Sequence, residues 1–164
     1  MSGGDRLRIP ASAIEAIGDE VLAFGSRDVE TGGFVMAARD GDTVSIVAVA
    51  GNTGIVRRGN LFVMSELALD RIFTFADDRQ MWIPAQFHSH RLGAFLSETD
   101  KEHGLRVDGF ISVVIPTYSD PPRDVARWGW WRFGAGRWRT IEPGGIAGGQ
   151  VDVVRFDEDG VRGP

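Results

Sequence analysis

The sequence contains no cysteine, no excess of basic residues and no long apolar run. Without thiols, the chain has no disulfide framework, no thiolate zinc site and no cysteine nucleophile. The net charge is −5, from 18 Lys and Arg against 23 Asp and Glu, so the basic excess that usually supports phosphate binding is lacking. We therefore expect no nucleic-acid partner, and a DNA-associated function is disfavoured.

No stretch of about 18 apolar residues occurs, so the sequence predicts no membrane-spanning helix and no membrane partner. Residues 1–8 carry no apolar segment of the kind that a secretory signal has, and we expect a cytoplasmic protein. The 164 residues suffice for one domain with its own core.

The hydrophobic pattern alternates between helix and strand periods, which predicts a mixed α/β or α+β domain. Helices are expected over residues 10–24, after the N-cap Ser65, and between the N-cap Ser97 and Gly104. Strands are expected over residues 33–38, 43–50, 60–64, 81–90, 110–116, 126–133 and 137–141. Residues 1–142 form the predicted domain, and 143–164 form a glycine-rich linker and tail. Residues 151–156 of this tail either pair with a sheet edge or are unstructured.

The three histidines lie between positions 88 and 103. His88 and His90 are two residues apart at the end of a predicted strand, so both imidazoles point to the same side. Ser97 and Asp100 follow, with Asp100 in the first turn of the next helix. Two imidazoles and a carboxylate can form a hydrolytic zinc site with a fourth position for water. The serine and the aspartate also fit an ordinary helix cap, and the two interpretations are compatible.

Water activated by zinc needs a proton acceptor, and the candidate is Glu30 in the string Glu30-Thr31-Gly32-Gly33. A single glutamate is more often a solvated surface charge. The two glycines that follow allow a close approach of backbone, as a tight site entrance requires.

Glu-Thr-Gly-Gly, then His-Ser-His, a short spacer and Ser-x-x-Asp together resemble the JAMM (MPN-plus) zinc metalloprotease family. The likeness covers residues 9–141 and is greatest to small bacterial members associated with ubiquitin-like conjugation systems. It implies a single MPN/JAMM-type domain, cytidine-deaminase-like, with a curved mixed β-sheet flanked by helices. The chain departs from the family pattern at Arg91, where proline is usual, and in a spacer before Ser97 that is one residue short.

The resemblance implies that His88, His90 and Asp100 hold one zinc ion, that Glu30 is the general acid/base, and that Ser97 stabilises the oxyanion. The implied reaction is hydrolysis of the amide bond at the C-terminal tail of a ubiquitin-like protein, in deconjugation or in precursor processing. The implied partners are the ubiquitin-like protein or its conjugate, with E1-like and E2-like enzymes of the same pathway.

Two other functions remain open. Some relatives release an amino acid from a sulfur-carrier protein, and others are metal-free scaffold modules that have lost the ligands. The complete set of ligand-type residues disfavours a scaffold.

Two further features have weaker functional signals. His103 lies one helical turn beyond Asp100 and either supports the site or is an exposed histidine. Tryptophan and arginine alternate over residues 127–139, which forms either a partner surface or a hairpin with cross-strand aromatic packing. The pattern favours packing.

Overall fold

The computed structural model describes residues 7–163; the first six residues of the predicted domain and the last of the tail lie outside them. The helices are α1 (Ala11–Gly25), α2 (Glu66–Asp78) and α3 (Glu98–His103). The strands are β1 (Ile9–Pro10), β2 (Gly32–Ala38), β3 (Val44–Ala50), β4 (Ile55–Arg58), β5 (Leu61–Met64), β6 (Met81–Ser89), β7 (Ile111–Ile115), β8 (Gly129–Gly134), β9 (Arg137–Thr140), β10 (Ile146–Ala147), β11 (Asp152–Asp157) and β12 (Gly160–Arg162). Among the described residues, no helix is both long and apolar enough to cross a bilayer.

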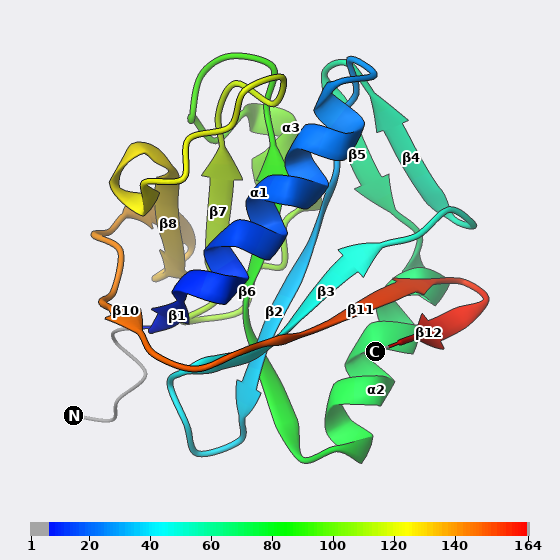
Figure 1. Ribbon diagram of the computed structural model, residues 1–164, viewed down its shortest axis with the longest axis vertical. Coiled ribbons are helices and arrows are strands. Elements are labelled where there is room, and N and C mark those ends of the chain that lie inside the picture. Colours follow the sequence, from blue (N-terminus) through cyan, green and yellow to red (C-terminus); the bar gives the residue numbers. More distant parts are fainter. Residues whose placement is uncertain (1–6, 164) are drawn as a thin grey trace.

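Eight strands form one mixed sheet in the order β12-β11-β3-β2-β6-β7-β8-β9 (Figure 1). The pairs β3/β11 and β6/β7 are parallel, and the other neighbours are antiparallel. The expected mixed α/β architecture with a mixed sheet and helices is confirmed. Strands β4 and β5 form a separate antiparallel hairpin, and β1 pairs with β10.

The chain beyond residue 142 contributes three strands. β11 runs parallel to β3, from Asp152 beside Ile46 to Phe156 beside Ala50, and β12 returns antiparallel to it. Of the two alternatives for residues 151–156, pairing with the sheet edge is the one adopted. Phe156 is completely buried, so the side chains of this segment take part in the core.

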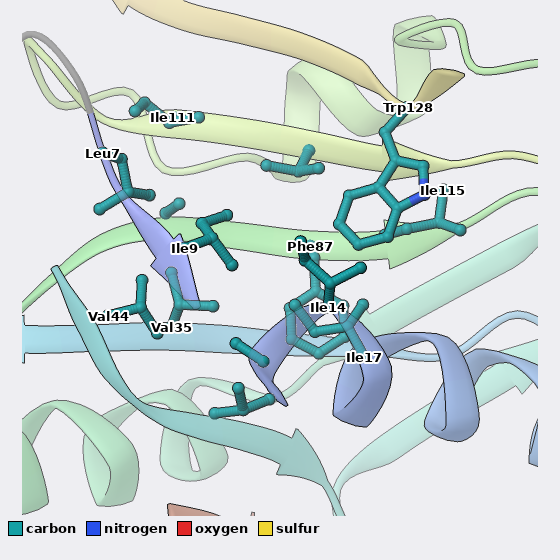
Figure 2. Packing of buried hydrophobic residues seen from close by; sticks show 14 of the residues in the cluster. Leu7, Ile9, Ile14, Ile17, Val35, Val44, Phe87, Ile111, Ile115 and Trp128 are labelled. Atoms are coloured by element: carbon teal, nitrogen blue, oxygen red, sulfur yellow. The ribbon is translucent and has the colours of Figure 1, made fainter. Parts of the chain in front are cut away.

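Alternation along the strands divides the core between the two faces of the sheet. On β2, Val35 belongs to a cluster of buried apolar residues that includes α1. Its neighbour Phe34 belongs to a second such cluster, on the other face, which includes α2. Figure 2 shows Ile14 and Ile17 of α1 against Phe87 of β6. The sheet is therefore covered by α1 on one face and by α2 on the other.

Several elements differ from expectation, among them the short strands β1, β10 and β12, which were not expected. The hairpin strand β4 was not expected, because its short sequence Ile-Val-Arg-Arg carries two charges and no long alternation. The strand expected from residue 126 begins at Gly129, because Val125–Arg127 form a 3₁₀ turn whose Ala126 N–H bonds the Asp124 carboxylate at 3.0 Å. The expected N-cap of α2 is confirmed, with the Ala68 N–H donating to the Ser65 hydroxyl at 3.1 Å.

Candidate metal centre

The two neighbouring histidines lie at the end of β6. Phe87 belongs to the core under α1, so alternation directs His88 to the opposite face, and His90 follows it two residues later. Both rings are buried, with 6% and 7% of their residues' surface exposed, and their Nε2 atoms are 3.2 Å apart. The two imidazoles converge on one point, as the His-x-His spacing predicts.

Helix α3 brings a carboxylate to the same point. Its N-cap Ser97 accepts the Asp100 N–H at 3.1 Å, and Oδ2 of Asp100 accepts the Ser97 N–H at 2.9 Å, which is a capping box. The same Oδ2 atom lies 3.1 Å from Nε2 of His88 and 3.0 Å from Nε2 of His90. The helix cap and the convergence on the imidazoles therefore coexist, through one oxygen atom.

These three atoms fit a zinc ion. Zinc binds imidazole nitrogen and carboxylate oxygen at about 2.0–2.2 Å, and tetrahedral ligands at that distance are ~3.3 Å apart. The separations among His88, His90 and Asp100 are 3.0 to 3.2 Å, close to that value. Two imidazoles and one carboxylate also match a catalytic zinc centre in composition, with the fourth position left for water.

A hydrogen bond on the side away from the cluster orients the ring of His90. Its Nδ1 atom lies 3.1 Å from the Gly93 carbonyl oxygen, which can only accept, so Nδ1 carries a proton. In the neutral ring Nε2 then has a free lone pair directed at the cluster, the usual second-shell arrangement of a metal-binding histidine. The Phe95 ring packs edge-on against this imidazole, with centroids 4.9 Å apart.

The glutamate reaches the cluster through the pairing of β2 with β6. Gly32 lies opposite His88 in this antiparallel pair, and the register continues with Thr31 beside Ser89. The buried Ser89 hydroxyl accepts the Thr31 N–H at 2.9 Å, and the Ser89 N–H donates to the Thr31 carbonyl at 2.9 Å. This double contact fixes the backbone next to Glu30. Sequence reasoning missed the role of Ser89, although strand alternation between the two histidines could have indicated it.

Glu30 is buried, with 3% of its surface exposed. One of its carboxylate oxygens lies within 4.8 Å of a ring nitrogen of His88 and of His90, so these three residues could also hold a metal ion. The Asp100 oxygen lies nearer to both rings, which favours Asp100 as the third ligand and leaves Glu30 at the distance of a base acting through one water. The glycines that follow admit close packing, since a Cβ on Gly32 would meet the Phe62 ring at 2.7 Å.

An arginine of the unexpected strand β4 ties the hairpin to this region. Arg57 donates to the carbonyls of Gly51 and Ala50 at 2.6 Å each and to the Thr31 hydroxyl at 3.1 Å. Its guanidinium carbon lies 3.9 Å from the centre of the Phe24 ring, and burial lowers its pKa to about 10. This contact could not be expected from the sequence, because the strand that carries Arg57 was not predicted.

The charges of the cluster depend on one another. Burial raises the pKa of Glu30 to about 8. Burial alone would raise the pKa of Asp100 too, but hydrogen bonds from His88 and His90 hold it well below its ordinary range. Burial lowers the pKa of His90, but the hydrogen bond with Asp100 outweighs this, so the pKa is raised. The group thus stabilises a positive charge beside Asp100, which a proton or a divalent cation can supply.

Two hollows adjoin the cluster from different sides. One, of about 70 Å³, lies along β5, β6 and α3 and is bordered by His88, Asp100 and the exposed His103. The other, of about 400 Å³, is bordered by Glu30, His90, Ser97 and others. His103 thus lies on a wall of the first hollow and is not one of the three converging residues.

The tryptophans of residues 127–139 mainly pack. Trp128 and Trp130 are each 4% exposed and stack at 6.3 Å, and their indole N–H groups donate to the carbonyls of Pro122 and Val125. Trp138 packs edge-on against the neighbouring Phe133. The favoured packing interpretation agrees with these contacts.

No family model matches the chain, and no curated protein matches it. Several solved structures are similar to it in fold. A protein of Desulfitobacterium hafniense superposes with a TM-score of 0.65 at 16% identity, covering 87% of this chain and 92% of that one. A JAB1/MPN domain protein of Archaeoglobus fulgidus gives 0.55 at 13% identity, covering 85% and 99%. A protein of Salinibacter ruber gives 0.55 at 16% identity, covering 84% and 90%.

The chain therefore has an MPN/JAB-like fold, as the resemblance implies. At these identities the comparison concerns the fold alone. Within that fold, this chain has a buried Glu30–His88–His90 group that could bind a metal.

The two possible ligand sets predict different metal contents for two variants. If His88, His90 and Asp100 are the ligands, Glu30→Gln keeps about one zinc per chain, whereas Asp100→Asn loses affinity by more than the ~10- to 100-fold typical of an outer-shell change. Zinc competition with a chromophoric chelator, on variants checked for folding by circular dichroism, measures both. Loss of zinc in Glu30→Gln with retention in Asp100→Asn would assign the glutamate as the third ligand.

Glu30 also predicts a pH dependence of stability. Its pKa is 4.5 ordinarily and about 8 in the folded protein, so above pH 4.5 the unfolded chain releases a proton that the folded one keeps. The burial of Glu30 thus becomes costly between these values, at most by a few kcal/mol. In chelator-treated protein, Glu30→Gln should be no more stable than wild type at pH 4.5 and increasingly more stable towards pH 8. Denaturant unfolding across this range checks it, and a constant difference between the two proteins would contradict it.

Proposed function

We propose that the chain is a zinc-dependent peptidase or isopeptidase that hydrolyses the amide bond at the C-terminal tail of a ubiquitin-like protein. The observation that carries this proposal is the convergence of His88, His90 and Asp100 within 3.0 to 3.2 Å, beside the buried carboxyl of Glu30. A ligand set with an adjacent base is what metal-assisted amide hydrolysis needs.

Zinc held by His88, His90 and Asp100 would supply Lewis acidity and would lower the pKa of a water to ~7. Glu30 accepts the proton of the attacking water and returns it to the leaving nitrogen. The C–N bond breaks, the nitrogen leaves as an amine with the proton from Glu30, and the acyl carbon keeps the hydroxyl as a carboxylic acid, which releases its proton to the amine or to solvent at neutral pH.

Ser97 can stabilise the carbonyl oxygen while charge develops on it. Its oxygen accepts the Asp100 N–H, and among residues 7–163 no acceptor is found for its own O–H. Ser97 borders the larger hollow, and a hydroxyl without an internal acceptor can donate to a substrate there. In other hydrolases one such donor is worth roughly 3–4 kcal/mol of transition-state stabilisation.

The tail has a candidate binding edge on β5. In the described part of the chain, β5 has one ladder partner, β4, and its residues Phe62, Val63 and Met64 border the 70 Å³ hollow that leads to His88 and Asp100. An extended segment can add to such an edge as a strand. A tail ending in glycine suits a narrow hollow because it has no side chain to place there.

The substrate class comes from the resemblance of the site strings to the JAMM family. The proposed partners are accordingly a ubiquitin-like protein or its conjugate, with E1-like and E2-like enzymes of the same pathway. Release of an amino acid from a sulfur-carrier protein uses the same chemistry and differs only in the leaving group.

A substrate trap tests the proposal. Glu30→Gln protein, expressed in the native host and isolated under mild conditions, should retain a small β-grasp-sized protein with a glycine-ended tail, free or conjugated, that wild type does not retain. Zinc-loaded wild type should then cleave the trapped conjugate after its terminal glycine, as intact mass spectrometry would show. Ser97→Ala should cleave it ~100-fold or more slowly.

His103→Ala, altered on the wall of the smaller hollow but outside the converging residues, serves as a matched control and should keep its zinc. Partners that are stoichiometric and equally abundant with wild type and Glu30→Gln would instead favour a scaffold. A free amino acid as the sole second product would identify the sulfur-carrier reaction.

A further inference from the structure

The larger hollow contains a cation that the proposed chemistry does not use. Arg91 directly follows His90, at the position where the resembled family usually has proline. Its exposed side chain borders the 400 Å³ hollow together with Glu30, Ser97 and Asn60. Among the described residues that line this hollow, Arg91 carries the single guanidinium or ammonium group.

The guanidinium of Arg91 lies against the buried Tyr118 ring and the backbone of Gly59. Its carbon lies 5.9 Å from the centre of the Tyr118 ring, and its Nη2 atom is so close to the Gly59 backbone that a Cβ there would lie 2.9 Å away. Tyr118 is 1% exposed and donates to the Gly59 carbonyl at 3.3 Å. Within residues 7–163 no carboxylate lies within 4.0 Å of Arg91. Its fork of N–H donors is therefore open to a ligand.

The two hollows suggest where the acyl side and the leaving-group side of the substrate lie. If the acyl tail lies along β5 in the smaller hollow, the leaving nitrogen and its attached residue enter the larger one. Glu30, which returns the proton to that nitrogen, borders the larger hollow, in agreement with this direction.

We propose that Arg91 binds a carboxylate on the leaving-group side of the scissile amide, an inference that rests on the proposed function. Leu92 and Phe95, 71% and 58% exposed on the rim of the same hollow, contact the apolar part of the leaving residue. The carboxylate is either the α-carboxylate of a C-terminal residue or an acidic side chain next to a modified lysine.

The chemistry of the hollow favours a carboxylate over other anions. A planar guanidinium pairs bidentately with a carboxylate, and the Asn60 amide adds a further neutral polar group. The hollow offers one guanidinium among its described lining residues, which balances the single charge of a carboxylate but only half the charge of a phosphate dianion. Arg91 is thus a specificity-determining residue.

Binding to zinc-loaded Glu30→Gln protein tests this without turnover. The first probe pair is acetyl-Val-Gly-Gly-Leu with a free carboxylate and the same peptide as its amide. The second pair is acetyl-Val-Gly-Gly joined to the lysine Nε of acetyl-Lys-Asp-amide or acetyl-Lys-Asn-amide. Calorimetry at constant pH should give about tenfold or tighter binding of the anionic member in at least one pair. The pair that discriminates identifies the source of the carboxylate.

Adding Arg91→Gln should abolish the discrimination, while zinc content stays the same. The matched control is Arg58→Gln, an equal change of charge on an exposed residue next to Gly59 that does not border the hollow. It should keep the discrimination. Equal binding within both pairs, absence of binding to all four probes, or an equal loss in the control would overturn the inference.

Hydrolysis by wild type separates this inference from the proposed function. If wild type cleaves neither free-acid peptide nor isopeptide while the Glu30→Gln protein still discriminates through Arg91, the proposed function fails and the carboxylate site stands. If wild type cleaves both members of a pair equally, with or without Arg91→Gln, the proposed function stands and the carboxylate site fails.

Discussion

One oxygen atom, Oδ2 of Asp100, connects the start of α3 to the end of β6. It accepts the N–H of Ser97 at 2.9 Å and lies 3.0 to 3.1 Å from the imidazoles of His88 and His90. A buried carboxylate needs such partners, because an isolated buried charge is strongly destabilising. The helix therefore cannot shift along its axis without losing both its cap and its contact with the strand, which makes the cluster a preorganised one.

The second constraint is the antiparallel pairing of β2 with β6. Its register places Thr31 beside Ser89 and so brings Glu30 to the histidines. The cost of burying Glu30, visible in its pKa of about 8, is offset by the packing around it. The hairpin of β4 and β5 adds to this through Arg57, which bonds both the end of β3 and Thr31. A group with a raised pKa at a cluster of ligands is what a proton-transferring site requires.

Much of this could be predicted from local pattern. The alternation of His88 and His90, the Ser97 cap and the three helices follow from short-range periodicity and capping preferences. Contacts between segments distant in the sequence could not be predicted in this way. β4 is too short to show the alternation of apolar and polar residues that marks a strand. The pairing of β11 with β3 joins segments about a hundred residues apart. The hydrogen bond from His90 to the Gly93 carbonyl depends on the path of a loop. The position of Arg91 in the hollow depends on Gly59 and Tyr118, which are distant in sequence.

We propose that zinc binds at this cluster and that Glu30 beside it is the base. Anomalous diffraction at the zinc edge, on crystals of the protein grown with one equivalent of zinc, tests it most directly. We expect a single strong peak bounded by Nε2 of His88, Nε2 of His90 and Oδ2 of Asp100, with no Glu30 oxygen at bonding distance. A peak bonded to Glu30 in place of Asp100, or no peak at this cluster, would contradict it.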